Sequence, residues 1–246
     1  MRKKHNRKGK RALIHQGKRI IQRINGKQPV HFLHLGKTGG TAIRHALKDI
    51  KSNRYVMHFH RHDVTISDIP RGEGVVFFLR DPIARYLSGF YSRQREGKPK
   101  YYSPWSPAER IAFSTFSTPN ELAVALSSKN EEEREEAEVA MKSIGHVRSH
   151  YWDWFENEEY FMSRMTDIVF IGYQETLEKE FERLKVVLGL PESAALPVDD
   201  TKSHRNPKGL DKTLEDRAIE NLRSWYNEDY KFMSLCRKLE HSVPPA

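Results

Sequence analysis

The sequence predicts an α/β protein in which helices flank a parallel β-sheet. Four short runs rich in Val, Ile and Phe are bounded by Gly, Pro or Asp, which is typical of buried strands. Segments with helical periodicity separate or follow these runs, and strands that alternate with helices form right-handed parallel crossovers. The chain has 246 residues, of which 37% are apolar, so it can bury the core of such a domain.

The four expected strands cover residues 29–35, 54–60, 74–79 and 167–172. Each is short and strongly apolar, as strands covered on both faces are. Ligands of parallel sheets bind beyond the carboxyl ends of the strands, so the residues that directly follow these runs are the first candidates for a site.

Apolar periodicity predicts three helices. Residues 82–95 begin with Pro82, which suits a first helical position, and carry apolar residues at i, i+3, i+4, i+7 and i+8. Residues 175–190 have one apolar face and end near Gly189. A last helix is expected over about 211–240.

Three further segments have a simple structural interpretation. The acidic run 130–138 is expected to be the solvated face of a helix. Residues 101–107 are aromatic but broken by proline, which predicts a surface loop. The aromatic run 150–155 has helical spacing and is typical of core.

Positive charge is concentrated at the N-terminus. Residues 1–27 hold eleven Lys and Arg and no acidic residue, whereas residues 28–246 hold 31 basic and 33 acidic residues. We therefore divide the chain into a basic, flexible arm over 1–27 and a single α/β domain over 28–246. The arm is suited to contact with anionic lipid, nucleic acid or another acidic polymer, and salt would weaken that contact.

The sequence favours a cytoplasmic location. The early apolar runs are too short for a secretory signal, and the longest apolar run, VVFFL at 75–79, is far too short to span a bilayer, so no transmembrane segment is expected. Cys236 is the single cysteine, which excludes an intrachain disulfide and a cysteine-based zinc site. Binding of anionic lipid by the arm would place the protein at the membrane periphery.

A glycine-rich loop, HLGKTGGTAIRHAL, follows the first strand over residues 34–47 and leads into a helix that is expected to reach about Ile50. It contains the end of the GxxxxGK[ST] phosphate-binding motif, but His31 stands where the first glycine would be. The loop therefore favours a phosphate site that does not hold a magnesium triphosphate. The residues expected to bind the anion are Gly36, Lys37, Thr38, Gly39, Gly40 and Thr41.

A second phosphate site is expected at Arg80 and Ser88. Arg80 directly follows the third strand, and Ser88 lies eight residues later, two turns into the next helix. A guanidinium and a hydroxyl that converge at this edge suit a phosphate. Each residue alone also has an ordinary structural explanation: Arg80 as an ion-pair partner of Asp81, and Ser88 as a small packing residue.

The two motifs together resemble those of the sulfotransferases. HLGKTGGTAIRHAL is similar to the 5′-phosphosulfate loop of their carbohydrate and membrane-type branch, and FFLRDPIARYLSGFYS is similar to their 3′-phosphate signature. The spacing of about 40 residues between the motifs also matches. The resemblance is specific over about 31–92, looser over 169–184 and 202–209, weak over 93–165 and absent over 1–27.

The resemblance implies a sulfotransferase fold, with a P-loop-NTPase-like sheet, in a soluble bacterial enzyme. It implies the donor 3′-phosphoadenosine 5′-phosphosulfate (PAPS), with Arg80 and Ser88 at the 3′-phosphate. Arg80 stands where a magnesium-holding acid would end the strand, and sulfuryl transfer needs no metal. Arg205 falls in a segment similar to a loop that closes over the nucleotide, although a surface basic cluster is an alternative there.

In-line sulfuryl transfer requires a cation at the leaving phosphate and a base at the acceptor. Lys37 is the expected cation. Among the histidines of MHFHRHDV, His62 is the expected base, because it lies past the strand end and begins a segment similar to one that carries the catalytic histidine in several carbohydrate sulfotransferases. His60 is the alternative base.

The histidines also permit a zinc site as an alternative, because alternation along a strand places His58, His60 and His62 on one face. Hydrogen-bonded strand residues are the commoner explanation of His58 and His60. His31 and His34, in the first strand, are expected to be structural.

The acceptor is expected to be a hydroxyl-bearing molecule, with a glycan as the first choice and another small molecule as the second. Residues 92–107 combine four Lys or Arg with three aromatic residues, which suits an anionic sugar. Two other functions stay open. One is a P-loop kinase that uses magnesium-ATP or magnesium-GTP, and the other is a non-enzymatic polyanion binder that acts through the basic arm.

Overall fold

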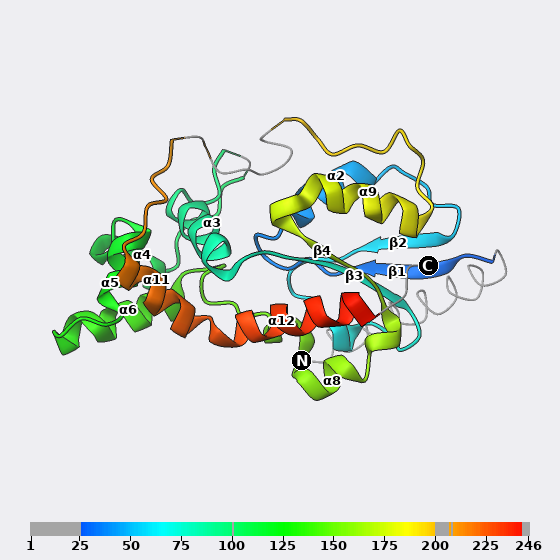
Figure 1. Ribbon diagram of the computed structural model, residues 1–246. Helices are drawn as coiled ribbons and strands as arrows, with labels where there is room; N and C mark the ends of the chain where they lie inside the picture. Colours follow the sequence, from blue (N-terminus) through cyan, green and yellow to red (C-terminus); the bar gives the residue numbers. More distant parts are fainter. Residues whose placement is uncertain (1–25, 100, 200–206, 208, 243–246) are drawn as a thin grey trace, which may run out of the picture.

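The computed structural model describes residues 26–99, 101–199, 207 and 209–242. Within them, four parallel strands form a sheet of order β2-β1-β3-β4 (Figure 1). The expected α/β class with a helix-flanked parallel sheet is confirmed. Most of the basic arm, and Arg205, lie outside the described residues. The strands are β1 (Gln28–Phe32), β2 (Tyr55–Phe59), β3 (Gly74–Leu79) and β4 (Ile168–Tyr173).

The first strand ends earlier than the sequence predicts. Leu33 still donates its backbone N–H to the Val76 carbonyl oxygen at 2.9 Å, but the expected continuation to residue 35 is wrong. The chain instead turns into the glycine-rich loop, where Lys37 has a φ of 68° and Gly39 a φ of 89°. These left-handed conformations are incompatible with a strand.

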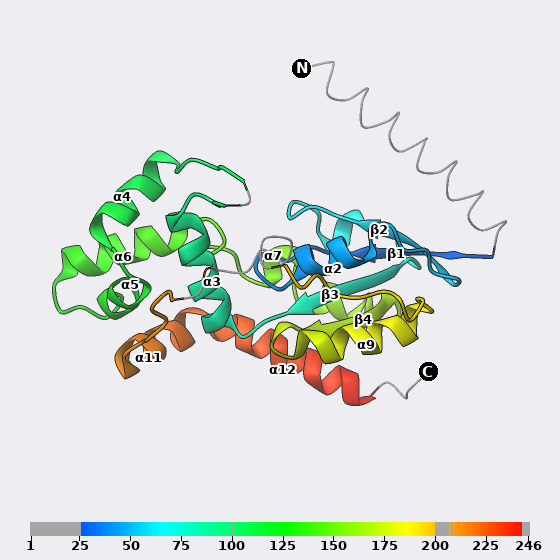
Figure 2. The ribbon, with the colours of Figure 1, turned by 90° about the horizontal axis from the view of Figure 1, so that it is seen from above.

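Helices cover both faces of the sheet (Figures 1 and 2). Alternation along β3 sends Val76 and Phe78 to one face and Phe77 and Leu79 to the other. The first face is covered by α2 (Gly40–Leu47) and α9 (Leu177–Leu188), and the second by α7 (Trp152–Phe155), α8 (Glu158–Met162) and α12 (Asn227–Ser242). Short 3₁₀ helices are η1 (Ile66–Asp68), η2 (Met165–Asp167) and η3 (Gln174–Thr176).

A separate group of helices lies beyond the carboxyl ends of the strands (Figure 2). It packs around the expected apolar stripe of residues 82–95, whose Tyr86 and Phe90 are buried. The acidic run 130–138 is a solvated helix face as predicted, with Ala137 turned to the core. The group contains α3 (Pro82–Gln94), α4 (Pro107–Thr115), α5 (Pro119–Ala125), α6 (Glu131–Ser143) and α11 (Asp216–Trp225).

Three expectations about other segments are confirmed. Gly189 ends α9 in the left-handed conformation, with a φ of 57°. Residues 101–106 form a loop without helix or strand. The aromatic run 150–155 belongs to the core, where Tyr151 and Phe155 are fully buried.

The single helix expected over about 211–240 is wrong, because α11 and α12 are separate and meet at Tyr226. The backbone of Tyr226 leaves the helical conformation, its ring is 1% exposed, and its hydroxyl donates to the Val147 carbonyl oxygen at 2.7 Å. This buried anchor redirects the chain, so α11 packs in the helical group and α12 packs on the sheet.

Two buried carboxylates hold the loop that runs from Gly145 to Tyr151. Glu109 accepts the Gly145 N–H at 3.0 Å and also binds the Arg93 guanidinium at 2.6 and 2.8 Å. Burial alone would raise the pKa of Glu109, but hydrogen bonds from Arg93, Ser106 and Gly145 lower it to about 2.

At the other end of this loop, Asp229 accepts the Tyr151 N–H at 2.5 Å and an imidazole N–H of His150 at 2.7 Å. Arg85, which is 1% exposed, lies 3.6 Å from Asp229 and donates to the Ser149 carbonyl oxygen. The loop is therefore fixed by α4 and α12 rather than by its own sequence.

We expect Glu109→Gln to lower the free energy of unfolding by about 3 kcal/mol at pH 7, because it leaves Arg93 buried without its ionic partner. The pKa of Glu109 is lowered in the folded state, so its contribution is present above the unfolded pKa and is lost as the pH falls toward 2. Urea unfolding at pH 7 and pH 3 measures both effects.

The matched control is Glu138→Gln, which removes the exposed pair with Lys142 on α6. We expect a change below 1 kcal/mol there. An equal, small loss in both variants would contradict the anchoring role of Glu109.

Candidate functional site

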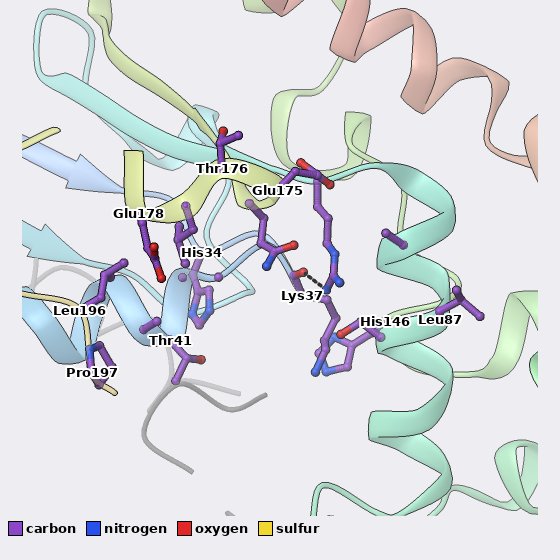
Figure 3. A pocket seen from close by; sticks show the side chains of 18 of the residues that line it. His34, Lys37, Thr41, Leu87, His146, Glu175, Thr176, Glu178, Leu196 and Pro197 are labelled. Carbon is purple, nitrogen blue, oxygen red and sulfur yellow. Dashed lines mark hydrogen bonds between the residues drawn. The ribbon is translucent and has the colours of Figure 1, made fainter. Parts of the chain in front are cut away.

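The carboxyl ends of all four strands open onto one cavity of about 780 Å³ (Figure 3). Strands β2 and β3 lie on opposite sides of β1, so the strand order reverses at β1. Ligands of open α/β sheets bind at the carboxyl ends of the strands beside such a reversal. Each strand is followed, within three residues of its end, by at least one residue that lines the cavity. These residues are His34 after β1, His62 after β2, Arg80 after β3, and Gln174 and Glu175 after β4.

Lys37 projects its ammonium group into the wall of this cavity. The Nζ atom is buried and has no hydrogen-bond partner among the described residues. Burial, followed by the positive charges of Arg95 and Arg80, lowers the pKa of Lys37 to about 7. Its backbone has a φ of 68°, a conformation that costs a non-glycine residue energy and is concentrated at functional sites. The site therefore holds a strained, poorly solvated cation, which an anion would stabilise.

Arg80 lies beside Lys37. Its guanidinium donates one hydrogen bond to the Lys37 carbonyl oxygen at 3.3 Å, and its Nε is buried without a partner among the described residues. Burial lowers the pKa of Arg80, although Glu175 opposes this effect. The Tyr151 hydroxyl bonds to the backbone N–H and carbonyl oxygen of Arg80 and fixes this residue at the strand end.

Ser88 is where the sequence predicted it. It is buried on α3, and it lines the same cavity as Arg80. The guanidinium and the hydroxyl therefore face one space, although they come from different parts of the chain.

The glycine-rich loop contributes unequally to the cavity. Gly39, Gly40 and Thr41 line it, and Gly39, the N-cap of α2, supplies no side-chain hydrogen bond, so the start of this helix adjoins the cavity. The Thr38 side chain is 1% exposed, and its hydroxyl donates to the Leu35 carbonyl oxygen at 3.0 Å. Gly36 is also buried, and neither Gly36 nor Thr38, both expected to bind the anion, lines the cavity.

His62 lies in the cavity with a defined tautomer. Its Nδ1 lies 2.7 Å from the His34 carbonyl oxygen, which can only accept, so Nδ1 carries the proton and Nε2 is the basic nitrogen. Although the residue as a whole is exposed, its ring packs against His34, with ring centroids 4.0 Å apart. Burial lowers the pKa of His62, the hydrogen bond to His34 partly restores it, and the charge of Lys37 lowers it again. His62 is therefore a neutral base at pH 7.

His60, the alternative base, is part of a different cluster. Its Nε2 lies 2.8 Å from Nδ1 of His31, whose Nε2 lies 2.8 Å from Glu73. His58 also stacks on His31, at 4.9 Å between ring centroids, so His58 and His60 share one partner whereas His62 lies against His34. In the part of the chain that the structure describes, no three His, Cys, Asp or Glu side chains are arranged to hold a metal ion.

The sequence analysis missed two histidines of the cavity. His34, expected to be structural, lines the wall, and its ring would collide with a side chain at Gly40. His146 comes from a distant loop that no motif indicated, and it lies beside Lys37 and His62. Tyr101, 44% exposed, also lines the cavity; it belongs to the segment 92–107, whose contact with an acceptor stays a prediction. The sequence feature that could have indicated His34 is its position at the start of the glycine-rich loop.

Comparisons with known proteins leave the chain without an assigned family. No model of a known protein family matches the sequence, and no curated protein matches it significantly. Across residues 26–99, 101–199, 207 and 209–242, no helix has both the length and the apolar character needed to cross a membrane. The geometry of the cavity is therefore the basis on which a function is proposed.

Proposed function

We propose that this protein is a sulfotransferase that moves the sulfuryl group of PAPS to a hydroxyl of an acceptor. The observation that carries the proposal is the pair Lys37 and Arg80, each with a buried nitrogen that has no hydrogen-bond partner in the described part of the chain, at the edge where the strands end. A buried cation without a partner is costly, and an anionic ligand with two separate charged ends would satisfy both.

The donor PAPS has two anionic ends, and each would have partners in the cavity. Its 5′-phosphosulfate would be held by Lys37 and by the free N–H groups at the start of α2. Its 3′-phosphate would be held by Arg80 and Ser88, which line the same cavity. A cavity of about 780 Å³ is large enough for a nucleotide of this size.

The transfer is an in-line displacement at sulfur. The acceptor oxygen forms a new bond to sulfur, while the bond between sulfur and the bridging phosphate oxygen breaks and its electron pair stays on that oxygen. The proton of the acceptor hydroxyl passes to Nε2 of His62, and Lys37 neutralises the charge that develops on the leaving phosphate. The products are a sulfate ester and adenosine 3′,5′-bisphosphate (PAP), and no metal is required.

The acceptor is proposed to be a glycan or another small hydroxylated molecule. Tyr101 offers an exposed ring at the rim of the cavity, and the charge of Arg95 acts on Lys37 within it. An exposed aromatic ring suits stacking on a sugar, and positive charge nearby suits an anionic one. Contact of the arm over 1–27 with anionic lipid or polymer, and a role for Arg205 at the nucleotide, stay predictions.

The first experiment is calorimetric titration with PAP, and in parallel with magnesium-ATP and magnesium-GTP. We expect micromolar binding of PAP without metal, weakened about tenfold to a hundredfold in Arg80→Ala because charge-assisted hydrogen bonds are lost. The control is Arg110→Ala, an exposed arginine on α4. Binding of a magnesium triphosphate without binding of PAP would exclude the sulfotransferase and favour a kinase.

Binding of PAP is also expected to take up protons at pH 7.5, because the anion stabilises protonated Lys37, whose free pKa is about 7. Uptake is roughly 0.7 proton per site, and affinity falls as the pH rises above 7. Calorimetry in Tris and in HEPES measures it as a difference in enthalpy. Lys37→Arg, which keeps its charge at every pH, is the control that removes the uptake; equal enthalpies in both buffers for the wild type would contradict the low pKa.

Turnover is followed as PAP release from PAPS with a panel of oligosaccharides. Lys37→Ala and His62→Ala are each expected to lower it by about 10²-fold to 10⁴-fold, with unchanged melting temperatures. His45→Ala, on α2 outside the cavity, is the matched histidine control. Normal turnover in His62→Ala together with loss in His60→Gln would move the base to His60.

A further inference from the structure

His146 is the cavity residue to which the proposed mechanism assigns nothing. It lies in the loop that Glu109 and Asp229 hold, and its backbone has a φ of 66°. Lys37, which lines the same cavity, also has a left-handed backbone conformation. Two non-glycine residues held in this conformation at one site indicate that surrounding structure fixes both side chains at an energetic cost.

Two glycines make room for His146. A Cβ atom at Gly36, in the phosphate loop, would lie 2.9 Å from Nδ1 of the His146 ring. A Cβ atom at Gly89, on α3 next to Ser88, would lie 3.1 Å from the His146 Cβ. His146 thus lies between two segments: its ring packs against the loop expected to hold the 5′ end of the donor, and its Cβ and backbone pack against the helix expected to hold the 3′-phosphate.

The His146 ring is chemically available. It accepts and donates no hydrogen bond among the described residues, and it lines the cavity beside Lys37 (Figure 3). Its centroid lies 5.6 Å from that of His62. Burial, followed by the charges of Lys37 and His62, lowers the pKa of His146 well below its ordinary value, so the imidazole is neutral and carries one N–H donor.

We propose that His146 is a further catalytic residue, which donates its N–H to a non-bridging oxygen of the sulfuryl group during transfer. The inference rests on the proposed function. In an in-line reaction the leaving oxygen faces Lys37 and the attacking oxygen faces His62, so a ring beside both residues lies alongside the reacting sulfur. No bond to His146 forms or breaks, and it keeps its proton.

A neutral donor suits this position better than a third cation. Lys37 already carries a pKa of about 7 because of burial and neighbouring positive charge, and another charge beside it would favour its deprotonation. An imidazole N–H aimed at the sulfuryl oxygens stabilises the developing charge there without that penalty. The packing of His146 against Gly36 and Gly89 holds the donor in place before the substrate arrives.

The test uses orthovanadate, which adopts a five-coordinate geometry like that of the group in transit, titrated into the full chain saturated with PAP. The variants are His146→Ala and His146→Gln, which keeps an N–H donor, with His45→Ala as the control. We expect PAP affinity to stay within about threefold in all of them, while vanadate affinity falls at least tenfold in His146→Ala and recovers in part in His146→Gln.

A second readout needs no variant. In the wild-type protein, the imidazole ¹⁵N resonances of His146 are expected to shift when vanadate is added to the PAP complex, but not when PAP is added alone. Equal vanadate affinity in wild type and His146→Ala would overturn the inference, as would absence of vanadate binding or of this shift in a wild-type protein that binds PAP. Failure of the wild type to bind PAP would instead overturn the proposed function, and the inference with it.

Discussion

The cavity depends on the way in which two buried carboxylates fix the loop from Gly145 to Tyr151. Glu109 holds its first residue from α4, and Asp229 holds its last residue from the start of α12. A carboxylate that accepts backbone N–H groups inside a protein gives a strong bond and fixes the chain in one register. The Tyr151 hydroxyl in turn bonds to the backbone of Arg80. The position of this loop therefore sets the position of the residue that follows strand β3.

The fixed loop also helps to explain how backbone strain and buried charge coexist at the carboxyl ends of the strands. Lys37 and Arg80 each have a buried nitrogen without a hydrogen-bond partner among the residues that the structure describes, and Lys37 and His146 both have left-handed backbones. Such features are unfavourable one by one and persist only where the surrounding packing is strong enough to maintain them. Here the packing comes from three apolar clusters, two on the faces of the sheet and one in the helical group.

The helical group has a second consequence for the cavity. Because α3 begins two residues after Arg80, it brings Ser88 into the lining of the cavity at the strand ends. The cavity is therefore bounded by the sheet edge on one side and by α3 and the loop of His146 on another. The Nζ of Lys37 and the Nε of Arg80 are buried at this edge, and burial of charged groups strengthens the interactions between them.

The residue pattern alone predicted that the four strands exist, that α3 has an apolar stripe and that α9 ends at a left-handed glycine. Alternation, periodicity and glycine conformation are local properties. It also pointed to Lys37, Arg80 and His62, which lie near strand ends, and to Ser88 on the helix that follows Arg80; all four line the cavity. The break at Tyr226 could not be predicted, because the buried hydrogen bond that causes it joins residues far apart in the chain.

The remaining parts of the cavity depend on contacts across the fold. The pKa of Lys37 is lowered because its side chain is buried and because Arg95 and Arg80 lie near it. No local sequence pattern encodes that burial. His146 reaches the cavity because Gly36 and Gly89 leave it space and because Glu109 holds the residue before it. Site residues that lie within a single loop can therefore be predicted from the sequence. A residue that reaches the site only when three distant segments pack together depends on the tertiary structure.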